Sequence, residues 1–219
     1  MTKYDYVLFD LDGTLTDSGP GIMSSFAYAV EKMGDPVEDK QQFRRFVGPP
    51  LRDSFEKSLG YSAEDADKAV TFYREYYFGM GGALENTVYP GIEELLAGLK
   101  AEGKKLIVAT SKAEKGTKLV LEHFGLDKYF DFVATSNDAD RKYKIDVIRY
   151  ALEQCGIKDL DKAVMVGDRE NDISAAAEAG MDSIGVLYGY GDEEELTTAG
   201  ATFIAATAEE VGEIIGKNK

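Results

Sequence analysis

Several short apolar runs limit how this chain can fold. None of them alternates apolar with polar residues, which is the pattern of strands covered on both faces of a sheet. Stretches with helical spacing lie between the runs and close on glycine, as 91–103 does at Gly103. Strand and helix alternate from Ile92 onward, which predicts an α/β fold with a parallel sheet and helices on both faces. The expected strands are 6–9, 105–110, 130–135, 163–167 and 183–187, and the expected helices beside them 91–103, 115–125, 144–156 and 171–180.

One segment near the start interrupts this alternation. It has apolar residues at helical spacing but no convincing strand, and Ser62 with Asp65 three residues later is typical of a helix start. Its expected helices are 21–34, 50–60 and 62–79. The simplest interpretation is an all-helical insert after the first strand. We therefore predict an α/β core of residues 1–15 and 88–219 and a helical domain of residues 16–87.

Charge and cysteine content exclude several classes of function. The 25 basic and 40 acidic residues give a net charge of −15, which repels nucleic acid and anionic membrane surfaces. We expect neither partner, and an anionic small molecule would need a local cationic site. Cys155 is the only cysteine, no signal peptide is recognisable, and no apolar run approaches the roughly 20 residues of a membrane span. These features predict a cytoplasmic protein.

Polar residues that could take part in catalysis or ligand binding follow the expected strands. The carboxyl ends of parallel strands meet at one edge of a sheet, where ligands bind. Residues far apart in the chain should therefore meet there. They are Asp10 and Asp12 after the first strand, Thr110 and Ser111 after the second, Asp168 after the fourth, Asp172 in the next helix, and Lys144 at a helix start.

Several carboxylates at one place need a cation. Acids in a water-accessible cleft suit a hard, oxygen-preferring ion, so we expect Mg²⁺. His123 is the only histidine, which together with the single cysteine argues against zinc. An EF-hand is excluded because the twelfth position counted from Asp10 is Gly21. Gly13 would let the backbone turn sharply after Asp12.

The motifs also resemble a family. "DLDGTLTDS", with Thr110, Lys144 and "GDRENDISAAAEAG", resembles the haloacid dehalogenase superfamily of phosphatases. Within it, the chain is most similar to the phosphoglycolate phosphatase-like branch, including "FVGPPLRDSF" and "VLYGYGDEEELTTAGA". The resemblance implies a Rossmann-like core with a helical cap domain after the first strand.

The resemblance also implies a role for each motif residue. Asp10 would attack phosphorus and become an aspartyl phosphate, and Asp12 would be the general acid–base. Lys144 would neutralise the phosphoryl oxygens, and Asp172 would support the metal or orient Lys144. The implied Mg²⁺ ligands are Asp10, the Asp12 backbone carbonyl, Asp168 and Asp172, and the implied phosphate-binding residues Gly13, Thr110, Ser111 and Lys144.

Some positions leave alternatives open. Lys142 competes with Lys144 for the cationic role, because Ile145 stands where the family usually has proline. Thr110 or Ser111 could instead cap the following helix. The cap arginines are either a solvated face or a clamp for a second anionic group of the substrate. They are Arg44, Arg45 and Arg52, of which we retain Arg45 and Arg52 as candidate substrate-binding residues.

These features together predict a Mg²⁺-dependent phosphomonoesterase acting on a small phosphorylated metabolite. Phosphoglycolate and 5′-nucleotides are the best candidates for the substrate. A phosphosugar mutase, a pyrophosphatase of the same fold and a non-catalytic phosphate-binding module are the alternatives. The protein is expected to be a monomer or a homodimer.

Overall fold

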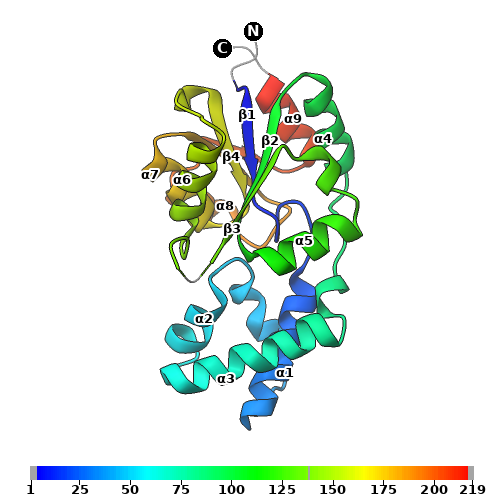
Figure 1. Cartoon of the computed structure of the whole chain (residues 1–219), viewed down its shortest axis with the longest axis vertical. Helices are drawn as coiled ribbons and strands as arrows, with labels where there is room; N and C mark the ends of the chain where they lie inside the picture. Colours follow the sequence, from blue (N-terminus) through cyan, green and yellow to red (C-terminus); the bar gives the residue numbers. More distant parts are fainter. Residues whose placement is uncertain (1–3, 138, 217–219) are drawn as a thin grey trace.

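Six parallel strands form one sheet in the computed structural model, which describes residues 4–137 and 139–216 (Figure 1). The strand order is β3-β2-β1-β4-β5-β6. Because β1 lies between β2 and β4, the residues that follow it lie in the middle of the sheet edge. The strands are β1 Tyr6–Phe9, β2 Lys105–Ala113, β3 Phe132–Ser136, β4 Ala163–Gly167, β5 Asp182–Val186 and β6 Phe203–Ala205.

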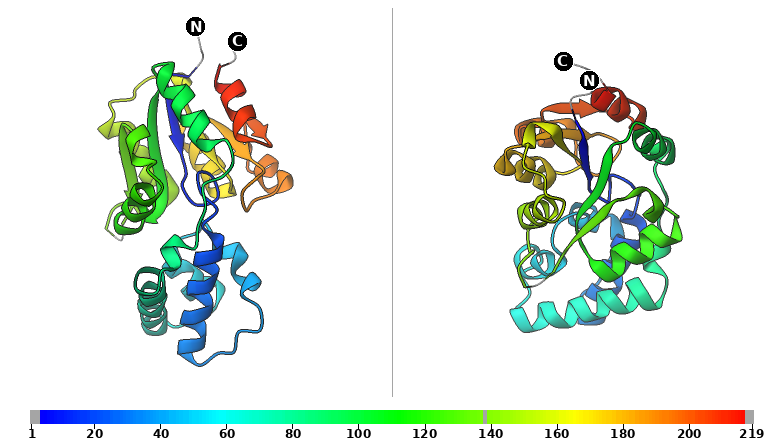
Figure 2. Two further views of the ribbon diagram at one scale, coloured as in Figure 1. Left: turned by 90° about the vertical axis from the view of Figure 1, so that its right-hand side faces the viewer. Right: turned by 45° about the horizontal axis from the view of Figure 1, so that its top comes forward.

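Helices cover both faces of the sheet, as predicted (Figures 1 and 2). Val7 and Phe9 of β1 pack with the helices of one face, and Leu8 packs with those of the other. The side chains of β1 therefore meet apolar neighbours on both faces, which explains its unbroken apolar run. One face carries α4 Ile92–Ala101, α5 Glu114–His123 and α9 Ala208–Gly216, and the other α6 Lys144–Gln154 and α7 Glu170–Ala179.

The prediction of the sheet was incomplete at one edge. β1 and β4 have the predicted bounds, whereas β2 continues to Ala113. Three elements near the C-terminus had no specific prediction: β6, the short helix α8 Glu193–Thr198, and α9. β6 has only three residues and packs at the sheet edge, so its sequence carries little strand pattern.

The segment between β1 and α4 is helical and lies beyond one end of the sheet (Figures 1 and 2). The predicted cap at Ser62 is present, since the Asp65 backbone N–H donates to the Ser62 hydroxyl at 3.1 Å. The helices are α1 Gly19–Met33, a 3₁₀ helix Lys40–Phe46, α2 Leu51–Asp53 continued as a π-helical turn Ser54–Ser58, α3 Ala63–Arg74 continued as a π-helical turn Glu75–Gly79, and a 3₁₀ turn Gly82–Leu84.

Phe26 of α1 organises an apolar cluster inside this helical segment. Its ring centroid lies 4.9 Å from that of Phe55, 5.1 Å from Phe46 and Tyr73, and 5.8 Å from Phe43. These contacts belong to a cluster of its own, apart from those at the sheet. We call residues 16–87 the cap, and we keep these bounds as a proposal.

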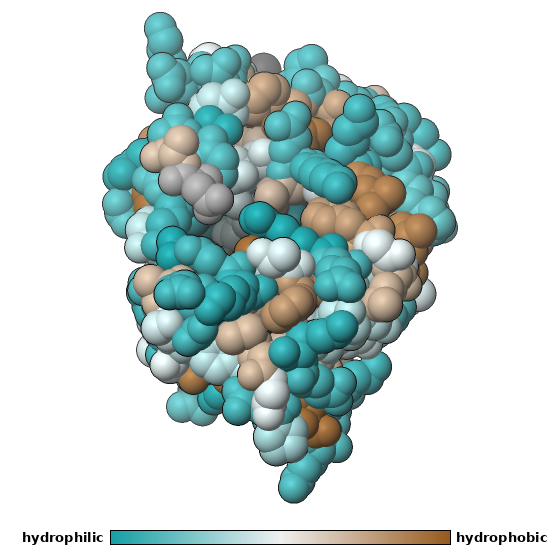
Figure 3. All heavy atoms as spheres, turned by 60° about the horizontal axis from the view of Figure 1, so that its bottom comes forward, coloured by the Kyte–Doolittle hydropathy of each residue, from teal (hydrophilic) through white to brown (hydrophobic). Residues whose placement is uncertain are grey.

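The surface agrees with the acidic composition. Hydrophilic side chains cover most of the face seen with the cap end forward, and hydrophobic side chains are grouped between them (Figure 3). None of the helices in the described part of the chain is both long and apolar enough to span a bilayer.

Candidate active site

Three buried aspartates meet at the carboxyl edge of the sheet. Asp10 follows β1, Asp168 follows β4, and Asp172 lies in the first turn of α7. Each offers a carboxylate oxygen within 4.8 Å of the others, and all three are buried. The sequence prediction that these distant segments converge is therefore correct in its geometry.

Lys144 joins two of these aspartates. Its Nζ lies 2.8 Å from an oxygen of Asp10 and 2.8 Å from an oxygen of Asp172, and it donates to the Ala109 carbonyl at 3.0 Å. Burial opposes the charged amine, but the attraction of the two carboxylates outweighs it and raises the pKa of Lys144. The second Asp172 oxygen accepts from the Arg169 backbone N–H at 3.1 Å, at the start of α7. Asp172 thus holds Lys144 in place.

Unlike Asp10 and Asp172, Asp168 forms no ion pair with a lysine of residues 4–137 and 139–216. Its carboxylate accepts hydrogen bonds from the Thr14 hydroxyl at 3.2 Å and from the Tyr190 backbone N–H at 2.8 Å. Gly13 makes this arrangement possible, because a Cβ there would lie 2.2 Å from an Asp168 oxygen. The φ of +90° at Gly13 is a second reason for glycine. Burial and the charge of nearby Asp172 raise the pKa of Asp168 well above its usual range.

The aspartate cluster has too much negative charge for its own residues to balance. Burial, together with the charges of Asp172 and Asp12, raises the pKa of Asp10 to about 6 against the attraction of Lys144. One lysine therefore does not compensate three buried carboxylates. An all-carboxylate oxygen donor set is suited to a hard divalent cation. Asp10, Asp168 and Asp172 fit such an ion.

Asp12 faces a lysine that the sequence analysis missed. Lys112 Nζ lies 2.9 Å from one oxygen of Asp12 and 2.7 Å from the other, and both side chains are only 10% exposed. The pairing of β2 with β3 is irregular between Thr110 and Ala113, which is where Lys112 leaves the sheet. Neither helical nor strand periodicity signals such a local irregularity.

Thr110 and Ser111 occupy different environments. Thr110 is buried, and its hydroxyl accepts from the Lys112 backbone N–H at 3.2 Å. Ser111 is half-buried and its carbonyl accepts from the Ser136 hydroxyl. The N-cap of α5 is Ala113, so neither residue caps that helix. A phosphate-binding role for Thr110 and Ser111 remains a prediction.

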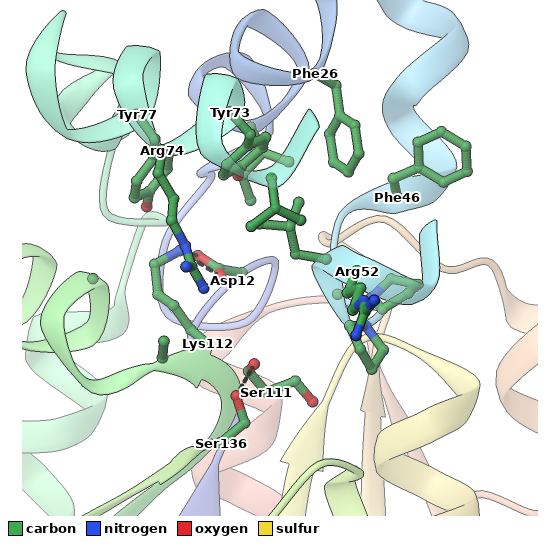
Figure 4. A pocket seen from close by; sticks show the side chains of 18 of the residues that line it. Asp12, Phe26, Phe46, Arg52, Tyr73, Arg74, Tyr77, Ser111, Lys112 and Ser136 are labelled. Carbon is green, nitrogen blue, oxygen red and sulfur yellow. Dashed lines mark hydrogen bonds and ion pairs between the residues drawn. The ribbon is translucent and has the colours of Figure 1, made fainter. Parts of the chain in front are cut away.

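A cavity of about 420 Å³ lies between the cap and the sheet edge (Figure 4). Asp12, Ser111 and Lys112 line it from the core. A smaller cavity of about 180 Å³ is lined by Ser111 and by Lys144, which contacts Asp10 and Asp172. The cap contributes an apolar wall that includes Ile22, Phe26, Phe46, Leu51, Val70 and Tyr73.

The cap arginines differ in position. Arg52 lines the cavity but pairs with Asp67 at 3.2 Å. Arg45 is exposed and its guanidinium lies 4.9 Å from the Phe46 ring centroid. Arg74, which the sequence analysis did not select, also lines the cavity and extends toward the core in Figure 4.

Lys142 and Arg74 differ in whether they pair with a carboxylate. Lys142 pairs with Asp53 of the cap at 3.0 Å, away from Asp10, whereas Lys144 contacts Asp10. Arg74 has no carboxylate partner among residues 4–137 and 139–216. Of the cations that line the larger cavity, Arg74 is therefore available for an anion.

Tyr190 connects the aspartate cluster to the base of the cap. Its backbone N–H binds Asp168, and its hydroxyl donates to Asp17 and accepts from the Gly19 N–H at 2.6 Å. The guanidinium of Arg44 lies 4.9 Å from the Tyr190 ring centroid. Tyr190, four residues after the end of β5, thus contacts an aspartate of the cluster, the connection into α1, and Arg44 of the cap.

Comparisons with known proteins agree with these motifs. The model of the haloacid dehalogenase-like hydrolase family matches residues 7–186. The crystal structure of a predicted phosphatase from Clostridium acetobutylicum is 47% identical, with a TM-score of 0.92 over 97% of this chain and 98% of that chain. Tyrosine-protein kinase PtkA of Mycobacterium tuberculosis is 41% identical over 214 residues, 96% of this chain and 72% of PtkA. A 5′-nucleotidase of Pseudomonas aeruginosa is 39% identical over 195 residues, 89% of this chain and 87% of the nucleotidase.

Phosphoglycolate phosphatases also occur among the relatives. The resemblance to haloacid dehalogenase-type phosphatases, predicted from the motifs, is therefore confirmed. The family match covers both the segment after β1 and the strands that bring the aspartates together. The chain belongs to the haloacid dehalogenase-like hydrolase family.

Proposed function

We propose that the protein is a Mg²⁺-dependent phosphomonoesterase that acts through an aspartyl phosphate on Asp10. The contact of Asp10 with Lys144, inside a cluster of buried carboxylates, is the observation that carries this proposal. A carboxylate is a weak nucleophile toward a phosphate ester unless the negative charge is neutralised. Lys144 supplies one positive charge beside Asp10. Asp10, the Asp12 backbone carbonyl, Asp168 and Asp172 would hold Mg²⁺, which would supply the rest of the neutralisation.

The reaction then divides into two transfers. An oxygen of Asp10 forms a bond to phosphorus while the bond to the leaving oxygen breaks, and Asp12 gives that oxygen a proton. Asp12 next takes a proton from a water molecule, whose oxygen attacks phosphorus and releases inorganic phosphate from Asp10. Positioning of the reacting groups and stabilisation of charge in the transition state supply most of the rate enhancement. Thr110 and Ser111 are proposed to donate to the phosphoryl oxygens.

The cavity supports a preference among the predicted substrates. Its volume of about 420 Å³ falls within the range of sites for small organic ligands, ~300–1,000 Å³. The wall of Phe26, Phe46 and Tyr73 suits a leaving group with an apolar or aromatic surface. A nucleoside meets this description, whereas glycolate is small and polar. We therefore rank 5′-nucleotides above phosphoglycolate, in line with the similarity to a 5′-nucleotidase.

A substrate screen with Mg²⁺ tests the proposal. Nucleoside monophosphates, phosphoglycolate, sugar phosphates and pyrophosphate are compared by release of inorganic phosphate. Asp10→Asn should lower kcat by about 10³-fold or more, while the matched surface variant Asp127→Asn retains wild-type activity. Full Mg²⁺-dependent activity in Asp10→Asn would rule the mechanism out.

Product analysis separates the alternatives. An isomerised sugar phosphate without free phosphate would indicate a mutase, and release of phosphate from pyrophosphate alone would indicate a pyrophosphatase. Transfer of phosphate from ATP to a tyrosine peptide, the activity in the name of PtkA, would indicate a kinase. Tight phosphate binding without turnover of any compound would indicate a non-catalytic module.

A further inference from the structure

The proposed mechanism leaves Lys112, a cation that lines the larger cavity with only 10% of its side chain exposed, without a role. Its Nζ contacts both oxygens of Asp12, at 2.9 Å and 2.7 Å. A lysine that contacts both oxygens fixes the plane of the carboxylate as well as its distance. Each oxygen has a second lone pair, so Asp12 can still exchange a proton with a group in the cavity.

The cap restrains Lys112 from the opposite side. Lys112 Nζ lies 4.9 Å from the ring centroid of Tyr77, which belongs to the π-helical turn after α3. Tyr77 is itself buried, and both residues line the cavity with Asp12 (Figure 4). A cation over the face of an aromatic ring is attracted to it. The ammonium group is therefore held between a core carboxylate and a cap ring.

The chain also makes room for the stem of Lys112. Gly116, in the first turns of α5, lies against it, so that a Cβ at Gly116 would come 3.2 Å from the Lys112 Cε. The irregular pairing of β2 after Thr110 releases Lys112 from the sheet at this point. A lysine side chain on an open surface can choose among many rotamers, whereas only 10% of the Lys112 side chain is exposed. This environment restricts Lys112 to the orientation that reaches Asp12.

We infer that Lys112 is a positioning residue, which holds the Asp12 side chain in its working orientation and is itself held there by Tyr77 of the cap. The inference rests on the proposed function, because it assigns Asp12 the proton transfer to the leaving oxygen. Loss of Lys112 would leave the Asp12 carboxylate free to rotate. The proton transfer would then suffer, and the contacts of Asp10 with Lys144 would remain.

Leaving groups of different basicity provide the test. An alkyl phosphate needs a proton on its leaving oxygen, whereas para-nitrophenyl phosphate releases a stabilised anion and does not. Lys112→Met should lower kcat/KM about 30-fold or more for the alkyl ester and less than about 3-fold for the aryl ester. Lys112→Arg, which can also contact both oxygens, should recover most of the alkyl activity.

The matched control is Lys115→Met. Lys115 makes the same kind of contact with the cap, 4.3 Å from the Phe78 ring centroid, but does not contact Asp12. It should retain wild-type kcat/KM for both esters. In an Asp12→Asn background, Lys112→Met should cause no further loss, because Lys112 acts through Asp12.

The outcomes distinguish this inference from the proposed function. Absence of any phosphomonoesterase activity in the wild type contradicts the proposed function. A wild type that is active, with equal loss for both esters in Lys112→Met or further loss in the Asp12→Asn background, overturns the role of Lys112 alone. Circular dichroism and thermal unfolding of each variant identify loss by misfolding, and in that case Lys112→Arg decides by its alkyl-to-aryl ratio.

Discussion

The Nζ atom of Lys144 lies 2.8 Å from an oxygen of Asp10; Lys144 is the first residue of α6, and Asp10 directly follows β1. This ion pair is almost completely buried, with 4% of each side chain exposed. Removing one partner of a buried pair leaves an uncompensated charge and is costly. Loss of either partner would therefore disturb both the sheet edge and the charge balance at the proposed nucleophile.

Lys144→Met and Lys142→Met should differ sharply in activity. Lys144 contacts Asp10, so its loss should lower kcat by about 10²–10³-fold. Lys142 pairs with Asp53 of the cap, so its loss should change kcat by less than about 3-fold. Phosphate release at saturating substrate measures both. Equal losses of kcat in the two variants would mean that Lys142 also acts as a cationic group at the site.

The stability of the metal-free protein should fall as the pH rises through the range in which Asp10 titrates. Its pKa is raised from 3.8 in the unfolded chain to about 6, so between these values the folded protein holds a proton that the unfolded chain has lost. Raising the pH therefore favours the unfolded state, by an amount on the order of 3 kcal/mol for Asp10 at pH 7. Urea unfolding in EDTA from pH 4 to 7 measures the trend.

Mg²⁺ should reverse this loss at pH 7, because it binds the ionised carboxylates of the folded protein. Asp168→Asn removes a buried carboxyl group beside Asp10 and Asp172, and with it one proposed ligand. It should raise the stability of the metal-free protein at pH 7 and abolish the stabilisation by Mg²⁺. An equal Mg²⁺ effect on Asp168→Asn and the wild type would place the metal elsewhere.

Arg74→Met should raise KM for substrates that carry a second anionic group. Arg74 lines the cavity without a carboxylate partner in the described parts of the chain, so an anion of the substrate can pair with it. We expect an increase of about 10-fold for such substrates and little change for those with one phosphate only. Arg45→Met, on the exposed side of the cap, is the matched control. If both variants behave alike, Arg74 does not bind the substrate.

Gly13→Ala should destabilise the protein and inactivate it. The new Cβ would overlap the Asp168 carboxylate at 2.2 Å, and the φ of +90° is unfavourable for alanine. We expect a loss of about 2–4 kcal/mol in the free energy of unfolding. Thermal unfolding at pH 7 measures it, and Gly98→Ala, which has open space around its Cβ, is the control. A variant with wild-type stability would mean that Asp168 can move aside without cost.

The sequence predicted the parts of the fold that depend on long apolar patterns and on strand order. β1 and β4 had the right bounds, and the convergence of Asp10, Asp168 and Lys144 followed from the geometry of parallel strands. The short strand β6 lacked enough residues for a pattern. The Asp12–Lys112 contact could not be predicted, because it depends on the irregular pairing of β2 with β3 between Thr110 and Ala113.

Only some of the helices of the cap could be predicted from the sequence. Helical spacing located α1 and α3, but the 3₁₀ helix Lys40–Phe46 has no such periodicity. Which arginine faces the cavity depends on how the cap is placed over the sheet edge. That placement is set by contacts between distant residues, such as Lys142 with Asp53, which no local pattern encodes.

The contacts of Tyr190 limit how freely caps can be exchanged among relatives. A chimera that joins this core to a foreign cap must supply a carboxylate at the place of Asp17 and a glycine at that of Gly19, where a Cβ would lie 2.4 Å from the Tyr190 hydroxyl oxygen. Otherwise the hydroxyl loses its partners, while the backbone N–H of the same residue still binds Asp168. Inheritance of a new cap would thus disturb the loop after β5 that binds Asp168, and the two parts of the chain are expected to evolve together.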